Sequence, residues 1–186
     1  MRHSLTRLVK RLPPPDAPTD ADVDWDLLEE FLGLTYPSDF KDLIGKYGRG
    51  RWFDHASFIY DTPKNQLQAC QAVKNAATRL HPLLQLGMRD DSREELKLPC
   101  YPSPGGLFPF MNDLSGSVYC WLTKPKNPEK WPVYCWFQGS GPIIENMSAS
   151  QMLIDWLDGK PIMTDLWGNV DELPEERLVF DANKPT

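Results

Sequence analysis

Two amphipathic helical patterns follow each other near the N-terminus and constrain the fold more than any other feature. Thr19 or Asp20 can cap the first pattern, which runs from about Asp20 to Leu32. Pro37 begins the second, in which Phe40, Leu43, Ile44 and Tyr47 have the i, i+3, i+4, i+7 spacing of one helix face. Gly33 and Gly48 suit the two ends. Because the link is only about four residues long, we expect a helical hairpin.

The tetrapeptide VYCW occurs twice, at Val118–Trp121 and Val133–Trp136. Apolar residues occupy both alternating sets of positions, which is typical of strands that are buried on both faces. The proline-rich loop TKPKNPEKWP between the copies predicts an antiparallel pair. Weaker strand patterns cover Trp52–Tyr60 and Leu107–Met111.

Two further helices are predicted. One spans Lys64–Leu80 between two prolines, and the other spans Ser148–Asp158, where Ser148 and Gln151 form an S-x-x-Q capping box before a stop at Gly159 and Pro161. The chain also contains 18 prolines, which argue against an all-helical bundle. The order helix, helix, strands, helix predicts an α+β fold.

Composition suggests one domain with two distinct ends. We divide the 186 residues into a basic, proline-rich N-terminal arm (1–18), a central domain (19–160) and an acidic C-terminal extension (161–186). The arm has helical apolar spacing, so we expect a short helix docked on the domain or a frayed end, with a membrane-surface or nucleic-acid arm as the alternative.

The net charge of −6 argues against non-specific nucleic-acid binding, which needs a basic surface. Acidic residues concentrate between Asp16 and Asp42 and again after Asp155, and they would form one acidic surface if these segments met in space. No apolar run is long enough to span a membrane, and the N-terminus lacks the apolar region of a signal peptide. We therefore expect a cytoplasmic protein with no membrane partner.

The residues that usually perform chemistry form no recognisable motif. The four cysteines include no C-x-x-C pair, so we expect small, reduced apolar residues instead of a disulfide or metal site. His3, His55 and His81 belong to no catalytic or metal-binding pattern. We expect no catalytic residues, no cofactor and no metal, and hence no enzyme.

Three segments together resemble the SUKH superfamily (the Smi/Knr family). WDLLEEFLGLTYPSDFKDLIGKYGRG supplies its "LG…P-x-D-F-K-x-L…Y-G-x-G" pattern, LFPFMNDLSGSVYCWL is similar to its "P-x-x-x-(D/N)-x-x-G-x-x-(Y/F)-x-W" strand, and MSASQMLIDWLDGK resembles its terminal helix. The three occur in family order over roughly residues 22–160. A longer central segment, around Arg79–Gly106, and the acidic tail depart from the pattern.

The resemblance implies helices packed on a mainly antiparallel twisted sheet, without catalytic residues. It also implies an immunity protein that binds and neutralises a polymorphic toxin domain, often a nuclease, as a monomer or weak homodimer. The alternative is a regulatory or scaffolding protein-binding domain. An acidic inhibitor would use carboxylates for steering and aromatic residues as anchors. Our candidate partner-binding residues are Arg51, Trp52, Asp54, Asp113 and Glu145.

Overall fold

The structure is a computed structural model, and it describes residues 2–59, 68, 71, 74, 75, 98–136, 143, 144, 146–175 and 178–182. In chain order the described elements are α1 (Arg2–Arg11), α2 (Trp25–Leu32), α3 (Ser38–Tyr47), β1 (Arg51–Trp52), β2 (Ala56–Phe58), β3 (Leu107–Asp113), β4 (Val118–Leu122), η1 (Pro128–Lys130), β5 (Val133–Trp136), β6 (Ile143–Ile144), α5 (Ala149–Leu157), α6 (Pro161–Trp167), η2 (Val170–Glu172) and β7 (Phe180–Asp181).

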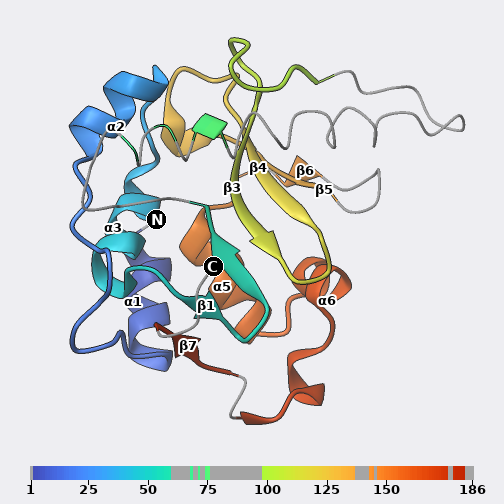
Figure 1. The fold of residues 1–186 in the computed structure, drawn as a ribbon. Helices are drawn as coiled ribbons and strands as arrows, with labels where there is room; N and C mark the ends of the chain where they lie inside the picture. The colour runs from blue at the N-terminus through green and yellow to red at the C-terminus, as the bar shows by residue number, and fades with distance from the viewer. Residues whose placement is uncertain are drawn as a thin grey trace, which may run out of the picture.

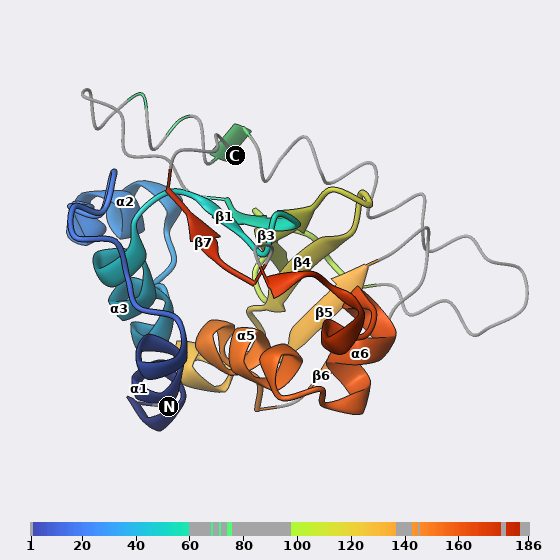
Figure 2. The same ribbon diagram turned by 90° about the horizontal axis from the view of Figure 1, so that it is seen from below.

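The strands form one antiparallel sheet in the order β6-β5-β4-β3-β2-β1-β7 (Figure 1). Helices α1, α3 and α5 pack against one another, and Figure 2 shows α1 and α5 on the same side of this sheet. The predicted α+β fold is therefore confirmed.

The helical hairpin is present, but its first helix starts later than predicted. Asp24, not Thr19 or Asp20, caps α2: its Oδ1 accepts a hydrogen bond from the Leu27 N–H at 3.0 Å. Asp20 instead has a left-handed φ of 54° and forms an ion pair with Arg49 at 3.1 Å. Gly33 ends α2 in the left-handed conformation, as expected.

A buried carboxylate joins the helical hairpin to α5. Asp39, in the first turn of α3, is 4% exposed. Its two oxygens accept hydrogen bonds from the N–H and the hydroxyl of Ser150, at 2.9 and 2.5 Å. Ser148 caps α5 by accepting from the Gln151 N–H at 3.2 Å, whereas the Gln151 side chain bonds Ser4 and Asp155 and does not complete the capping box.

The two VYCW strands pair as predicted but show opposite faces to the helices. In the register Tyr119 lies opposite Cys135 and Trp121 opposite Val133. Because directly opposed residues share a face, the aromatic side of β4 lies beside the small side of β5. The reverse face is also buried, around Cys100, Leu107, Val118, Cys120 and Tyr134.

The segment predicted as one strand at Trp52–Tyr60 is instead a hairpin, which corrects that prediction. Its turn is closed by a 2.9 Å hydrogen bond from the His55 N–H to the Trp52 carbonyl. Phe53 and Asp54 both have left-handed φ angles, 57° and 53°. The turn contains no glycine, so no turn motif marks it in the sequence.

The N-terminal arm and the described residues after α5 are integrated into the fold. Three leucines of the N-terminal arm are buried in the core, and Arg7 and Arg11 form ion pairs with Asp158 at the end of α5. Pro161, which we expected only to end the helix before it, is the first residue of α6. Met163 of this helix is fully buried. The boundary that we drew at residues 160 and 161 falls between two helices that contact each other.

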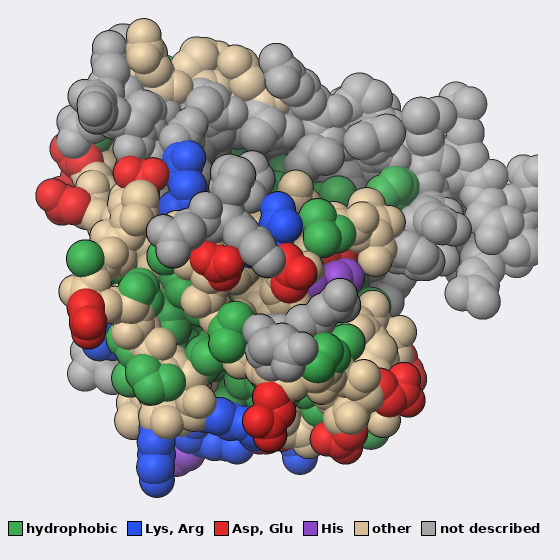
Figure 3. All heavy atoms as spheres, turned by 60° about the horizontal axis from the view of Figure 1, so that its bottom comes forward, with side chains coloured by type: hydrophobic (Ala, Val, Ile, Leu, Met, Phe, Trp, Pro, Cys, Tyr) green, Lys and Arg blue, Asp and Glu red, His purple; other side chains and the backbone are tan. Residues whose placement is uncertain are grey.

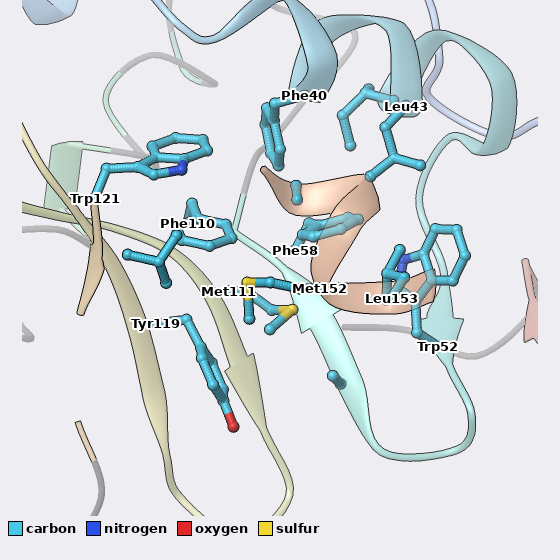
Figure 4. Packing of buried hydrophobic residues seen from close by; sticks show 14 of the residues in the cluster. Phe40, Leu43, Trp52, Phe58, Phe110, Met111, Tyr119, Trp121, Met152 and Leu153 are labelled. Atoms are coloured by element: carbon cyan, nitrogen blue, oxygen red, sulfur yellow. The ribbon is translucent and has the colours of Figure 1, made fainter. Parts of the chain in front are cut away.

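The core is aromatic, and its members Phe40, Tyr47, Trp121 and Trp156 are at most 2% exposed. Figure 4 shows side chains of α3 and α5 facing those of the sheet. Trp121 stacks on Phe110, with ring centroids 4.2 Å apart.

Cys100, Cys120 and Cys135 are buried, reduced thiols, and burial raises the pKa of each. Their burial as free thiols agrees with the prediction that the cysteines serve as small apolar residues. Cys70 and most of the predicted helix Lys64–Leu80 lie outside the described residues, although residues 68, 71, 74 and 75 are helical.

Candidate partner-binding surface

The structure brings four of the five predicted partner-binding residues to one end of the sheet. Arg51 lies on β1 and Asp54 in the β1–β2 turn, and the two form an ion pair at 3.6 Å. Trp52 is fully buried, so its indole belongs to the core and offers no surface to a partner. Asp113 starts the β3–β4 turn, and its side chain is 1% exposed. Glu145 lies outside the described residues.

The β1–β2 turn holds a strained backbone. A left-handed φ is unusual for a bulky residue such as Phe53 and costs on the order of 1–3 kcal/mol. Burial of the ring against Trp156, with centroids 4.5 Å apart, and a 2.9 Å hydrogen bond from the Phe53 N–H to the Val179 carbonyl offset this cost. The turn therefore has a fixed shape that presents Asp54.

Asp113 organises the neighbouring β3–β4 turn. Its Oδ1 accepts hydrogen bonds from the N–H groups of Ser115 and Ser117, both at 2.9 Å. Its Oδ2 accepts from the Tyr119 hydroxyl at 2.8 Å and lies 3.5 Å from His55 Nε2. Burial alone would raise the pKa of Asp113, but these donors together lower it to about 2. The carboxylate is therefore ionised at neutral pH and acts as an internal acceptor.

The same network reaches α6. The Tyr119 hydroxyl donates to Asp113 and accepts a hydrogen bond from Trp167 Nε1 at 2.5 Å. Burial and the Asp113 carboxylate raise the pKa of Tyr119, which keeps its proton on the hydroxyl. The Trp167 ring also lies 6.1 Å from the His55 ring. These contacts hold the β1–β2 turn, the β3–β4 turn and α6 together as one unit.

We use the name hairpin-tip surface for the solvent-accessible residues of this unit. The Leu114 N–H donates to the His55 carbonyl at 3.0 Å, which places the two turns side by side. Within the described chain the exposed large hydrophobic residues are Leu114 (65%), Val179 (41%) and Ile162 (37%). The hairpin-tip surface comprises Asp54, His55, Leu114, Trp167 and Val179, which lie in or against the two turns.

The exposed acidic residues at α2 and those at α6 lie at opposite ends of the molecule. α2 and α6 are far apart in both Figure 1 and Figure 2. The exposed acids at α2 are Asp22, Asp24, Asp26 and Glu30, and those at α6 and the segment after it are Asp165, Asp171, Glu172 and Glu175. Figure 3 shows acidic side chains near α6 and basic ones at the α1 end. These eight acidic residues therefore form two separate groups, and the second includes α6, the helix that contributes Trp167 to the hairpin-tip surface.

One open groove, of about 390 Å³, lies between the end of α2 and the loops at residues 101–105 and 123–131. Prolines, Tyr101 and Trp131 line it, and its lining includes no histidine, cysteine or carboxylate. It therefore lacks a pair of groups for general acid–base chemistry. Across the ranges given above, we find no cluster of three metal-ligating side chains and no helix that could cross a membrane.

The model of the SMI1-KNR4 cell-wall family (SUKH_6) matches residues 22–150, which is well over half of the chain. The chain belongs to this family. The family region runs from the residues before α2 to the first turn of α5, so it includes both turns of the hairpin-tip surface. α1, α6 and β7 lie outside the matched region. No curated protein and no solved structure matches the chain.

Sequence reasoning missed His55, Leu114, Trp167 and Val179 as surface residues. His55 was a lone histidine without a motif, and the other three carry no chemical signal by residue type. A partial signal existed in the loop NDLSGS, because an aspartate three residues before a glycine is typical of a turn in which the aspartate accepts backbone hydrogen bonds.

Proposed function

We propose that this SMI1-KNR4 family member is a non-catalytic immunity protein that neutralises a toxin domain through its hairpin-tip surface. The observation that carries the proposal is that the exposed Leu114 and Val179 both lie against the β1–β2 turn, joined to it by main-chain hydrogen bonds. Protein interfaces have an apolar centre surrounded by polar residues. Rigid presentation favours binding because little conformational entropy is lost on association.

Charge near this surface suits a basic partner. Asp54 lies within the surface, and Asp165, Asp171, Glu172 and Glu175 are exposed on α6, which carries Trp167, and in the segment that follows it. Carboxylates at the rim would speed association with a basic domain, and the apolar centre would slow dissociation. A nuclease domain fits the acidic charge near this surface, because its substrate groove must be basic.

The proposal predicts a neighbouring gene that encodes a large secreted protein with a C-terminal toxin module, and the direct test uses that module. Co-expression of the chain should restore growth of cells that produce this module. Leu114→Glu should weaken the complex by about 2 kcal/mol or more, because a charge would be buried at the centre of the interface. Isothermal titration calorimetry measures this change directly.

A matched pair of charge reversals locates the interface. Asp171→Lys with Glu172→Lys changes the rim of the hairpin-tip surface, whereas Asp26→Lys with Glu30→Lys makes the same change in net charge on α2. We expect the first pair to slow association at low salt more than the second. Equal effects of the two pairs would show that the net charge of the chain, and not the location of the charges, controls association.

Failure of the co-expressed chain to restore growth, with the chain folded and expressed, would favour a regulatory scaffold.

A further inference from the structure

The open groove described above lies at the other end of β3 and β4 from the hairpin-tip surface. The groove loop at residues 101–105 precedes β3, and the groove loop at residues 123–131 follows β4, so both lie far from the β3–β4 turn (Figure 1). The two strands have seven and five residues, which corresponds to a separation of about 20 Å. A ligand in the groove therefore leaves the hairpin-tip surface free.

The two aromatic rings of the groove are fixed by hydrogen bonds within the protein. The Tyr101 hydroxyl donates to the Leu32 carbonyl at 3.0 Å, and Trp131 Nε1 donates to the Pro125 carbonyl at 2.7 Å. Both rings are therefore held in place with their polar atoms already satisfied. What they offer to a ligand is apolar surface in a fixed arrangement.

Prolines form much of the groove wall, and they restrict the kind of ligand that fits. Pro102, Pro104, Pro125 and Pro128 all line the groove. Because proline has no N–H, these positions cannot donate to the backbone of an added β-strand. A polyproline II segment needs no such pairing, since it packs its rings into an apolar groove and loses little entropy on binding. The wall therefore suits a proline-rich segment better than a β-strand.

The rim of the groove is positively charged, although the chain as a whole has a net charge of −6. Lys124, Lys126 and Lys130 are exposed in the loop after β4, and none of them forms an ion pair with another residue that the structure describes. The one acidic residue of this loop, Glu129, is used elsewhere: its Oε1 accepts a hydrogen bond from the Ser38 N–H at 2.7 Å. The three lysines therefore favour an anionic ligand.

We propose that this groove is the docking site for an acidic, proline-rich segment of a partner protein. Prolines of that segment pack beside Tyr101 and Trp131, and its carboxylates pair with the three lysines of the rim. The groove lining lies wholly between residues 22 and 150, so the site belongs to the family domain and not to the added ends. Because the hairpin-tip surface stays free, the chain can hold two partners at once.

The test adds the full-length chain to the fluorescein-labelled, C-amidated peptide EEPPLPPEE and follows fluorescence anisotropy. We expect a Kd of about 100 µM or tighter that weakens as the salt concentration rises. The peptide KKPPLPPKK reverses the charges, and EEGGLGGEE removes the prolines. Each should bind about tenfold more weakly or less. In NMR spectra of the chain, the indole N–H signal of Trp131 should shift when EEPPLPPEE binds.

Matched variants locate the peptide in the groove. Lys126→Glu with Lys130→Glu reverses the charge of the rim and should weaken binding about tenfold or more. Lys46→Glu with Lys160→Glu makes the same change in net charge at exposed positions outside the groove, and it should change the Kd by less than about twofold. Ser103→Trp places a bulky ring in the groove and should abolish binding.

Four results would overturn the proposal. They are no binding of EEPPLPPEE, equal binding of KKPPLPPKK, binding that survives Ser103→Trp, and tighter binding of a nine-nucleotide oligothymidine than of the peptide. If Ser103→Trp does not fold, Thr35→Trp on the α2 side of the groove replaces it under the same criteria. The experiment contains no toxin, so its failure leaves the proposed immunity function untouched.

Discussion

Replacing Trp121 with alanine should lower the free energy of unfolding by about 3–5 kcal/mol. The indole is 2% exposed and lies at the centre of the aromatic core, where it stacks on Phe110 and meets Phe40 edge-on at 5.1 Å. Its removal loses both burial and ring contacts and leaves a cavity between α3 and the sheet. Urea unfolding followed by circular dichroism measures the change.

Trp25→Ala is the matched control because it removes the same side chain from a half-buried position on α2. Trp25 contacts Tyr36 at 5.1 Å but remains partly exposed. We expect a loss of about 1–2 kcal/mol there. A larger loss at Trp25 than at Trp121 would contradict the core described here.

The second large effect is expected at Asp113. Asp113→Asn should lower the free energy of unfolding by about 2–3 kcal/mol at pH 7, because the amide cannot accept all the hydrogen bonds of the buried carboxylate. The contribution of the Asp113 carboxylate to the free energy of unfolding also depends on pH. Its pKa falls from 3.8 to about 2 on folding, which corresponds to about 2 kcal/mol. That stability is fully present above pH 3.8 and is lost as the pH falls through about 2.

The difference between wild type and Asp113→Asn should therefore narrow by about 1 kcal/mol between pH 7 and pH 3. Urea unfolding at several pH values measures it. Asp54→Asn is the control: Asp54 is partly exposed, and its ion pair with Arg51 is long, so we expect a loss of about 0.5 kcal/mol or less. A pH-independent difference at Asp113 would show that its hydrogen bonds do not lower the pKa.

Local patterns made the central part of the fold predictable. The hairpin of α2 and α3 follows from helical periodicity, and the pairing of β4 with β5 follows from alternation and a proline-rich loop. The start of α2 was wrong because Asp20 and Asp24 are equally good caps by residue type, and only tertiary contacts of Asp20 with Arg49 decide between them.

The candidate surface depended on long-range contacts and could not be predicted in the same way. Asp113 resembles any surface aspartate in sequence, yet Tyr119, Trp167 and His55 surround it in the fold. Trp167 comes from a segment that composition alone marks as an acidic extension. The turn at Phe53 carries no glycine, so its left-handed backbone is imposed by packing against Trp156.

The most direct test of the central claim is hydrogen–deuterium exchange of the chain with and without the toxin module. The account predicts slower exchange on complex formation at residues 53–55, 113–117 and 162–167, and unchanged exchange in α2. Slower exchange confined to α2, with the hairpin-tip surface unaffected, would contradict it.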